Sequence, residues 1–455
     1  MKYIVLIIVC LTFSSCGKEF LDVKRDKGQV VPSTIADFQA LLDDASNTMN
    51  NSSSHELGVL GADEYTLSDQ TWENLSYRPY EKNAYIWANE VYENNQVNDW
   101  NSAYRRVLYA NTALLGINNI QPLASEKDAW SNVKGSALFF RAFNFYQLAQ
   151  LFCKPYSASA DADPGIPLRL DPDINLKTGR ANVAATYAQI ISDLNEASSL
   201  LPVSPVNLFR PSKPAVYALM AKTYLQMGQY EKAEQYASLS LALKGSLINY
   251  NSLSTSADYT FPLWGQGNPE VLLMCNMLNI AVVTTTRFNA SPELLGLYAS
   301  NDLRRKILYK TDTDGRILFK GSYAGLLAFF TGLSVDETLL IRAECYLRAG
   351  RIDETLADLN FLLKNRITTA GFQPLTVRDS AILISRIVEE RRKELALRGV
   401  RWEDLRRYNK EPALAKIQTR LLKGTTYQLL PNVLKYVWPI PQNAIETGGY
   451  EQNPR

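Results

Sequence analysis

Residues 214–243, PAVYALMAKTYLQMGQYEKAEQYASLSLAL, predict two short amphipathic helices that meet at Gly228. On the first helix, large and small apolar residues fall on one face at three- and four-residue spacing: Tyr217, Met220, Ala221, Tyr224 and Leu225. Gly228 can take the left-handed conformation that ends a helix, and Tyr230 then restarts the apolar face. This pattern is typical of a tetratricopeptide hairpin, which cannot bury its apolar face alone. We therefore expect partner hairpins elsewhere in the chain.

Three further segments repeat this spacing. They are residues 129–152 with a returning helix at 184–201, residues 336–366, and a weaker copy at 380–408. The copies lie much farther apart than the usual tetratricopeptide period of about 34 residues. The sequence thus predicts a mostly α-helical, tetratricopeptide-like helical-repeat scaffold of about four helix pairs, with long irregular insertions and a few short β-hairpins. One such hairpin is expected around the Asp-Gly pair of TDTDG, residues 311–315. Function is expected in the insertions.

Composition excludes several functional classes. Hydrophobic residues at 46% and charged residues at 21% indicate an ordinary globular protein, and a formal net charge of +2 argues against nucleic-acid binding. The single histidine, His55, discounts Ser-His-Asp hydrolysis and zinc proteolysis, and its polar context predicts a surface position. Cys153, Cys275 and Cys345 lie in apolar runs and are expected in the core. No cofactor and no metal site is predicted.

The N-terminus predicts export. Residues 1–15, MKYIVLIIVCLTFSS, combine a lysine with an apolar run too short to cross a bilayer, which is typical of a signal peptide. Cys16 follows directly, and this ending resembles a bacterial lipoprotein signal, in which the cysteine becomes the lipidated N-terminus. The alternative is an ordinary signal peptide with a chance cysteine. We expect residues 16–30 to be a lipidated tether and residues 31–455 to form one domain that meets the membrane only through the lipid.

Two irregular, aromatic-rich insertions, residues 47–95 and 245–323, are the expected ligand-binding regions. Sugars present flat apolar faces ringed by hydroxyls, so large rings beside short polar side chains suit them. The candidate ligand-binding residues are Trp72, Trp264, Tyr65, Tyr77, Tyr80, Trp87 and Tyr259. Possible hydrogen-bonding neighbours are Asp63, Asp69, Gln70, Asn74, Gln266 and Asn268. Trp72 and Trp264 are preferred because polar or glycine residues flank both. Alternatively, each ring packs a loop onto the scaffold.

A dense charged run, residues 389–394, predicts a solvated helix face with three- and four-spaced ion pairs. Its basic neighbours Arg401, Arg406 and Arg407 are interspersed with acids, so they do not indicate a nucleic-acid surface.

Taken in order along the chain, several motifs together resemble the SusD/RagB family of outer-membrane lipoproteins from Bacteroidetes-type bacteria. They are SSCGKEFLD (14–22), LFFRAFNFYQLAQLFCKPY (138–156), DPGIPL (163–168), RPSKPAVYALMAKTYLQMGQYEKA (210–233), SVDETLLIRAECYLRAG (334–350), EERRKELALRGVRWEDLRRYN (389–409) and YVWPIPQNAIETGGYEQNPR (436–455). The resemblance divides the domain into an N-terminal part of about residues 31–225 and a C-terminal part of about residues 270–455.

The resemblance implies capture rather than catalysis. It implies a lipid-anchored protein on the outer face of the outer membrane that binds an oligosaccharide and hands it to a SusC-like TonB-dependent transporter. The same importer role for peptides or another small nutrient is the alternative. A structural tetratricopeptide adaptor and a glycosidase with paired carboxylates are further alternatives, which the aromatic insertions and the resemblance disfavour.

Overall fold

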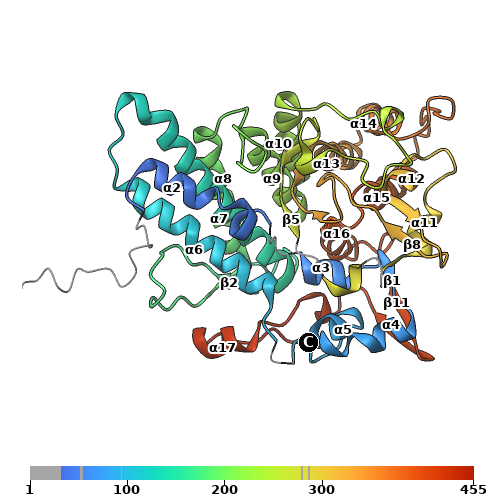
Figure 1. Ribbon diagram of the computed structural model, residues 1–455, viewed down its shortest axis with the longest axis horizontal. Helices are drawn as coiled ribbons and strands as arrows, with labels where there is room; N and C mark the ends of the chain where they lie inside the picture. The colour runs from blue at the N-terminus through green and yellow to red at the C-terminus, as the bar shows by residue number, and fades with distance from the viewer. Residues whose placement is uncertain (1–31, 52–54, 94, 278–279, 285–286) are drawn as a thin grey trace, which may run out of the picture.

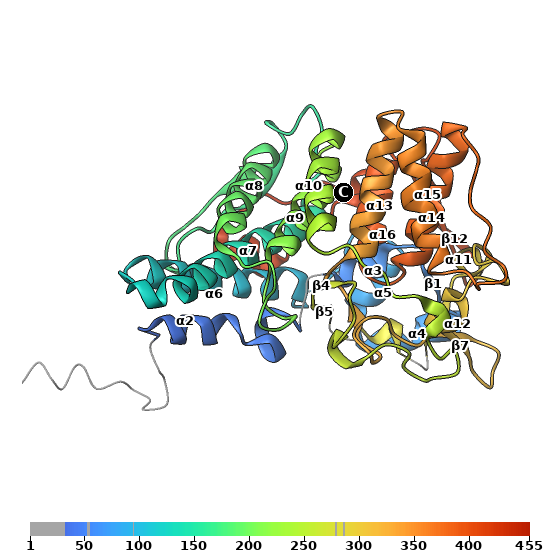
Figure 2. The same ribbon diagram turned by 90° about the horizontal axis from the view of Figure 1, so that it is seen from above.

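Four pairs of successive helices run through the chain, as the periodicity predicted. The computed structural model describes residues 32–51, 55–93, 95–277, 280–284 and 287–455. The pairs are α7 (Lys127–Phe152) with α8 (Val183–Leu200), α9 (Lys213–Gln226) with α10 (Tyr230–Leu243), α13 (Val335–Arg348) with α14 (Ile352–Lys364), and α15 (Ser380–Glu394) with α16 (Val400–Tyr408). Figure 2 shows α7 and α8 towards one end of the molecule, α9 and α10 in the middle, and α13–α16 towards the other end.

The first helix of the described chain also follows its prediction. Thr34 caps α2 (Ile35–Leu42), and its side chain and that of Asp37 form a reciprocal capping box. This helix packs on α6 (Asn98–Asn118) and α7. In the irregular insertion that follows, short elements lie together below α16 in Figure 1. They are α3 (Glu56–Gly61), β1 (Tyr65–Thr66), α4 (Asp69–Glu73) and α5 (Pro79–Tyr85).

The strands of the described residues form only two-stranded antiparallel sheets. The pairs are β1 with β6 (Asn289–Ala290), β2 (Pro164–Pro167) with β3 (Arg180–Asn182), β4 (Val271–Leu273) with β10 (Leu333–Ser334), β5 (Asn276–Met277) with β9 (Phe329–Phe330), β7 (Tyr309–Thr311) with β8 (Ile317–Phe319), and β11 (Gln418–Leu422) with β12 (Thr425–Leu429). The remaining helices are α11 (Pro292–Gly296), α12 (Arg304–Leu308) and α17 (Gln442–Gly448). The predicted hairpin at TDTDG is therefore confirmed as β7–β8.

Glycines at left-handed positions follow the first helix of two hairpins, α9–α10 and α13–α14, and a third such glycine caps the start of α16. Gly228 has φ +71°, Gly350 has φ +75°, and Gly399, which precedes α16, has φ +78°. The predicted role of Gly228 is thus confirmed. Gly399 has a second constraint, because a Cβ there would lie 2.5 Å from Cδ2 of His55.

Substituting Gly399 by alanine is expected to cost more stability than substituting Gly350. Both changes place a Cβ in the left-handed region, at about 1–2 kcal/mol. Around Gly350 a Cβ would meet nothing within 4 Å, whereas Gly399→Ala also overpacks against His55 and adds about 1–3 kcal/mol. Urea unfolding of the two variants measures the difference, and equal losses would contradict the close contact.

The prediction of a surface position for His55 was wrong. Its side chain is buried where α3 packs on α16, and burial lowers the pKa of its imidazole to about 3. The polar residues around His55 in the sequence do not reveal that α3, which begins at the next residue, is buried. The three cysteines, by contrast, are confirmed as buried, unpaired core residues.

The charged run at 389–394 was also misjudged as a solvated face. Glu390, Arg391, Lys393 and Glu394 are buried, and only Glu389 and Arg392 keep partial exposure. Their partners come from distant segments: Arg304 Nη1 lies 2.9 Å from Glu394 Oε2, and Arg366 Nε lies 2.8 Å from Glu394 Oε1. Burial without such partners would be strongly unfavourable, so the run is an internal ionic network rather than a surface.

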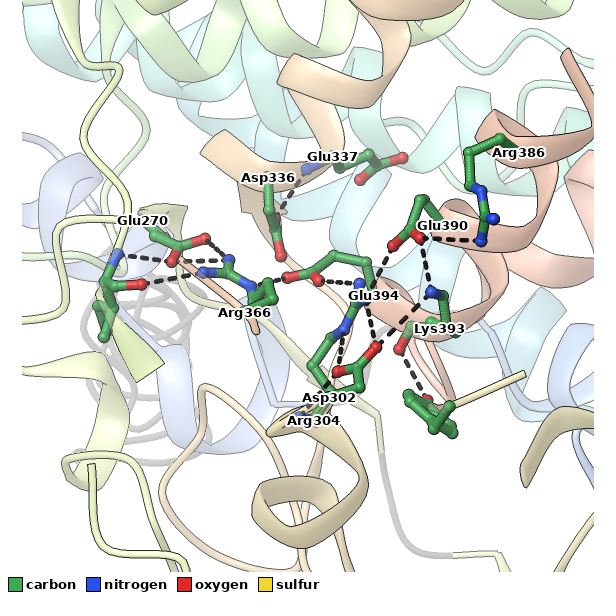
Figure 3. Close-up of polar contacts among 12 residues, drawn as sticks. Glu270, Asp302, Arg304, Asp336, Glu337, Arg366, Arg386, Glu390, Lys393 and Glu394 are labelled. Atoms are coloured by element: carbon green, nitrogen blue, oxygen red, sulfur yellow. Dashed lines mark hydrogen bonds and ion pairs between the residues drawn. The ribbon is translucent and has the colours of Figure 1, made fainter. Parts of the chain in front are cut away.

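This network, shown in Figure 3, joins four parts of the fold. Arg366, just after α14, lies between Glu270 at 2.9 Å and Glu394 of α15. Arg304 of α12 adds contacts to Asp302 at 2.7 Å and Glu390 at 2.8 Å. The network therefore ties the loop that ends at Glu270 to the helical scaffold.

Candidate functional site

The backbone at Trp264 is strained. Trp264 lies in a short 3₁₀ turn, Leu263–Gly265, and has φ +53°, a left-handed conformation that a bulky side chain rarely adopts. Gly265 and Gly267 on either side of Gln266 also have positive φ, and the Trp264 N–H donates to the Ala324 carbonyl at 2.8 Å, which holds the turn in place. Such strain persists only where surrounding structure imposes it. The buried Trp87 has the same backbone conformation, φ +52°, so the cavity beside Trp264, and not the strain alone, marks this residue as a candidate.

The Trp264 ring lines a cavity of about 540 Å³, hereafter the Trp264 cavity. This volume lies within the range of about 300–1,000 Å³ that is usual for ligand pockets. Three segments form its walls: the loop after α8, the end of α10, and the loop after Trp264. The lining residues are Val206, Asn207, Leu208, Phe209, Lys244, Trp264, Gln266, Gly267, Asn268 and Pro269. Two aromatic rings, a cation and several amides therefore share one concave surface.

Phe209 provides the second ring of this cavity. Its centroid lies 6.1 Å from that of Trp264, with 58° between the ring planes. The loop that carries it is fixed to the strand region because the Met274 N–H donates to the Leu208 carbonyl at 2.7 Å. Both residues are partly buried, and Phe209 packs against the hydrophobic core. A sugar ring can stack on such a surface.

Asn268 gives the cavity an unsatisfied hydrogen-bond donor. Its side chain is only 3% exposed, and its Oδ1 accepts from the Glu270 N–H at 2.9 Å. Within the described part of the chain, its Nδ2 has no hydrogen-bond partner. Nearly all buried polar groups are hydrogen-bonded, so a buried amide left with a free donor at a cavity wall suggests a ligand acceptor. Lys244 Nζ, in contrast, already donates to the Val271 carbonyl at 2.7 Å.

Three of the predicted ligand-binding rings, Tyr65, Tyr80 and Trp87, lie in the core instead. Tyr65 stacks on Phe288 at 6.0 Å, and Trp87 Nε1 donates to the Gly61 carbonyl at 3.0 Å. For these rings the structure shows the alternative, in which the ring packs a loop onto the scaffold.

The remaining predicted rings are accessible but separate from the Trp264 cavity. Trp72 is partly buried, donates through Nε1 to the Lys82 carbonyl at 3.2 Å, and has the Lys82 ammonium 4.3 Å from its ring centre. Tyr77 is 57% exposed, with Arg287 over its ring, and Tyr259 is 52% exposed. Lys82 thus covers one face of the Trp72 ring, and the nearby candidate Asp63 is held by Arg392, Arg401 and Lys416.

Among the described residues, three buried carboxylates come closest to an acid–base or metal centre. Oxygens of Glu270, Asp336 and Glu394 lie within 4.8 Å of one another, and burial raises the pKa of Glu270 to about 7. Close carboxylates of this kind are the signature of a retaining glycosidase. Here, however, Arg366 and Arg398 balance their charge and all three are buried, so a glycan could not reach them. This cluster gives no support to the glycosidase alternative.

Of the residues that line the Trp264 cavity, the sequence predicted Trp264, Gln266 and Asn268 as ligand-binding candidates but not Phe209 or Lys244. A usable signal existed for Phe209, since it is a large ring in the polar, proline-rich stretch PVSPVNLFRPS. Lys244 follows α10 with no distinguishing pattern. The lipidation candidate Cys16, the signal peptide and the tether lie outside the described residues.

Comparisons with known proteins bear on the whole chain. A family model described as "Starch-binding associating with outer membrane" matches residues 19–225, and one described as SusD family matches residues 336–455. SusD-like protein P2 of Formosa agariphila is 25% identical, with 89% of this chain and 90% of that protein covered.

Solved structures are similar in fold. A SusD superfamily protein from Bacteroides thetaiotaomicron has a TM-score of 0.73 at 22% identity and covers 93% of this chain and 100% of that one. A laminarin binding SusD-like protein has a TM-score of 0.65 at 17% identity, with 92% and 98% covered. These likenesses confirm the tetratricopeptide-like helical-repeat fold.

Among the helices of the described residues, none has the length and apolar character needed to span a bilayer.

Proposed function

This chain belongs to the SusD/RagB family, and from that premise we propose that it captures an oligosaccharide in the Trp264 cavity and delivers it to a SusC-like TonB-dependent transporter. The description of the matching family model, starch binding at the outer membrane, supports the ligand class and the location. The laminarin binding of one structural relative supports the ligand class as well.

One observation carries the assignment of the site: Trp264, Phe209 and the free Nδ2 of Asn268 share one cavity. The rings offer stacking surface to the apolar face of a sugar, and the amide donor suits a hydroxyl oxygen. The role is binding without chemistry. A peptide could use the same rings and amide, so it remains the alternative ligand.

The anchor belongs to the same proposal. We infer that residues 1–15 are cleaved, that Cys16 carries the lipid, and that residues 16–30 tether the domain to the outer face of the outer membrane. Several acyl chains hold a protein far more firmly than the marginal binding of one chain. Cys16→Ser should release the protein from the membrane fraction and abolish incorporation of labelled fatty acid.

Calorimetric titration of the purified protein tests the ligand and the site together. A panel of neutral oligosaccharides and a peptide pool are titrated into the wild type, Trp264→Ala and Trp72→Ala. At least one oligosaccharide should bind the wild type, and Trp264→Ala should weaken it by about 30-fold or more, as removal of a central aromatic does. Trp72→Ala should change the affinity by less than about threefold, because Lys82 already covers that ring.

The reverse ranking of the two variants would move the site to α4. Binding of peptides alone would replace the oligosaccharide by the alternative ligand. Co-purification with a TonB-dependent transporter, tested by pull-down from detergent-solubilised membranes, examines the partner independently.

A further inference from the structure

A second cavity, of about 350 Å³, lies beside the same loop that carries Trp264 and is strongly basic. Residues 255–258 form one wall, and α12, β7 and the residue after β8 form the others. Four cationic side chains line it: Arg305, Lys306, Lys310 and Lys320. The single acid is Asp258, so this basic cavity carries a formal charge of +3, whereas the whole chain carries only +2.

The positive charge of the basic cavity is largely unbalanced. Lys310 Nζ lies 2.9 Å from Asp258 Oδ1, but both side chains are well exposed, which makes this a weak pair. Within the part of the chain that the structure describes, no ion pair joins Arg305, Lys306 or Lys320 to a carboxylate. The Arg305 guanidinium lies 5.9 Å from the centre of the Tyr309 ring, which holds it at the wall.

Lys320 is the most telling of these groups because its side chain is buried, at 4% exposure. Its Nζ donates to the carbonyls of Thr255 at 3.2 Å and Lys306 at 3.3 Å. An ammonium has three protons, so one remains for a further acceptor. Burial lowers the pKa of Lys320, since the charged form is deprived of water. An anion in the basic cavity would restore the lost stabilisation of that charge.

The two cavities lie at opposite ends of one short stretch of chain. Asp258 lines the basic cavity and Trp264 lines the other, six residues farther along the chain. Six residues span at most about 20 Å, even when fully extended. The exposed side chains of Tyr259 and Leu263 lie between them in sequence. One loop thus carries aromatic and apolar contacts and, at Asp258, borders the cationic side chains of α12, β7 and Lys320.

We propose that the captured oligosaccharide is acidic, with a sulfate ester or a uronate carboxylate held in the basic cavity while a neighbouring sugar ring stacks at Trp264. This inference rests on the proposed function and adds the chemical class of its ligand. Sulfate and carboxylate share the chemistry that Arg and Lys recognise, namely a compact anion with several acceptor oxygens.

Titrations with three hexasaccharides test this proposal: a neutral β-glucan, an oligogalacturonate and a sulfated galactan. At about 0.05 M salt, at least one acidic oligosaccharide should bind about tenfold or more tightly than the neutral one, and at about 0.5 M salt screening should remove most of that advantage. Comparing the two acidic oligosaccharides distinguishes carboxylate from sulfate. Inorganic sulfate should compete with the bound acidic oligosaccharide only at a far higher concentration.

The double variant Arg305→Gln/Lys306→Gln removes two accessible cations without disturbing the core. It should abolish the preference for acidic oligosaccharides and leave neutral binding unchanged. The matched control, Lys127→Gln/Lys364→Gln, removes the same charge from exposed positions on α7 and α14 and should change neither.

Equal affinity for acidic and neutral oligosaccharides, or an unchanged preference in Arg305→Gln/Lys306→Gln, would overturn the acidic ligand while leaving neutral capture at Trp264 intact. The acidic ligand would also be overturned if inorganic sulfate bound the basic cavity as tightly as the sulfated oligosaccharide does. The basic cavity would then hold an adventitious ion only. Binding that requires Arg305 and Lys306 but survives Trp264→Ala would instead overturn the Trp264 cavity as the capture site.

Discussion

Replacing Arg366 by methionine should lower the free energy of unfolding by about 3–5 kcal/mol, the usual cost of removing one partner from a buried ion pair. Arg366 is fully buried and contacts two carboxylates, Glu270 at 2.9 Å and Glu394 at 2.8 Å. It also donates to the Ile248 carbonyl at 2.9 Å. Methionine fills much of the volume but leaves the buried Glu270 without its ion-pair partner and Glu394 with Arg304 alone.

Urea unfolding followed by circular dichroism measures this loss, and Arg378→Met is the matched control. Arg378 also pairs with an acid, Asp353 at 2.6 Å, but both side chains are exposed. Such a pair contributes about 0–1 kcal/mol. The prediction is wrong if the two variants lose similar stability, because the buried network would then add nothing beyond an ordinary surface pair.

The network links scaffold stability to the Trp264 cavity. Glu270 lies two residues after Asn268, and its N–H donates to the Asn268 side chain. The carboxylate of Glu270 is held by Arg366, while its neighbours in the loop line the cavity. The repeat helices therefore do more than support the insertion as a platform. They fix, through one arginine, the end of the loop that presents the ligand-binding groups.

The helical hairpins could be predicted because each is specified locally. Apolar spacing determines the buried face of α9 and α10, and Gly228 marks the turn between them without reference to the rest of the chain. Trp264 was predictable for the same reason. Its neighbours Gly265 and Gly267 permit the left-handed turn that turns its ring into the cavity.

Features that depend on distant partners could not be predicted in this way. Glu394 looks solvated within its own helix, and only Arg304 and Arg366, 90 and 28 residues away, make its burial possible. Trp87 sits in a polar stretch much like that of Trp264, yet its indole reaches the Gly61 carbonyl in the core. Local composition reports which residues can form a site, whereas tertiary packing decides which of them face a cavity.

Trp264→Gly should separate binding from stability. Glycine relieves left-handed backbone strain, which stabilises the fold by about 1–2 kcal/mol. This gain offsets two losses: the ring contact with Phe209 disappears, and glycine raises the chain entropy of the unfolded state. The free energy of unfolding should therefore change by less than about 1 kcal/mol. Oligosaccharide affinity should fall about 30-fold or more, since a central aromatic contact is lost.

Lys423→Gly is the matched control for this experiment. Lys423 also has a left-handed backbone, φ +49°, at an exposed position between β11 and β12. Glycine there relieves similar strain without removing a ring, so stability should hold or rise and affinity should stay unchanged. If Trp264→Gly instead lost more than about 2 kcal/mol of stability and kept its affinity, the ring would be a packing element, like Trp87. A strained tryptophan that contributes nothing net to stability but most of the affinity is, by contrast, what a residue retained for binding should show.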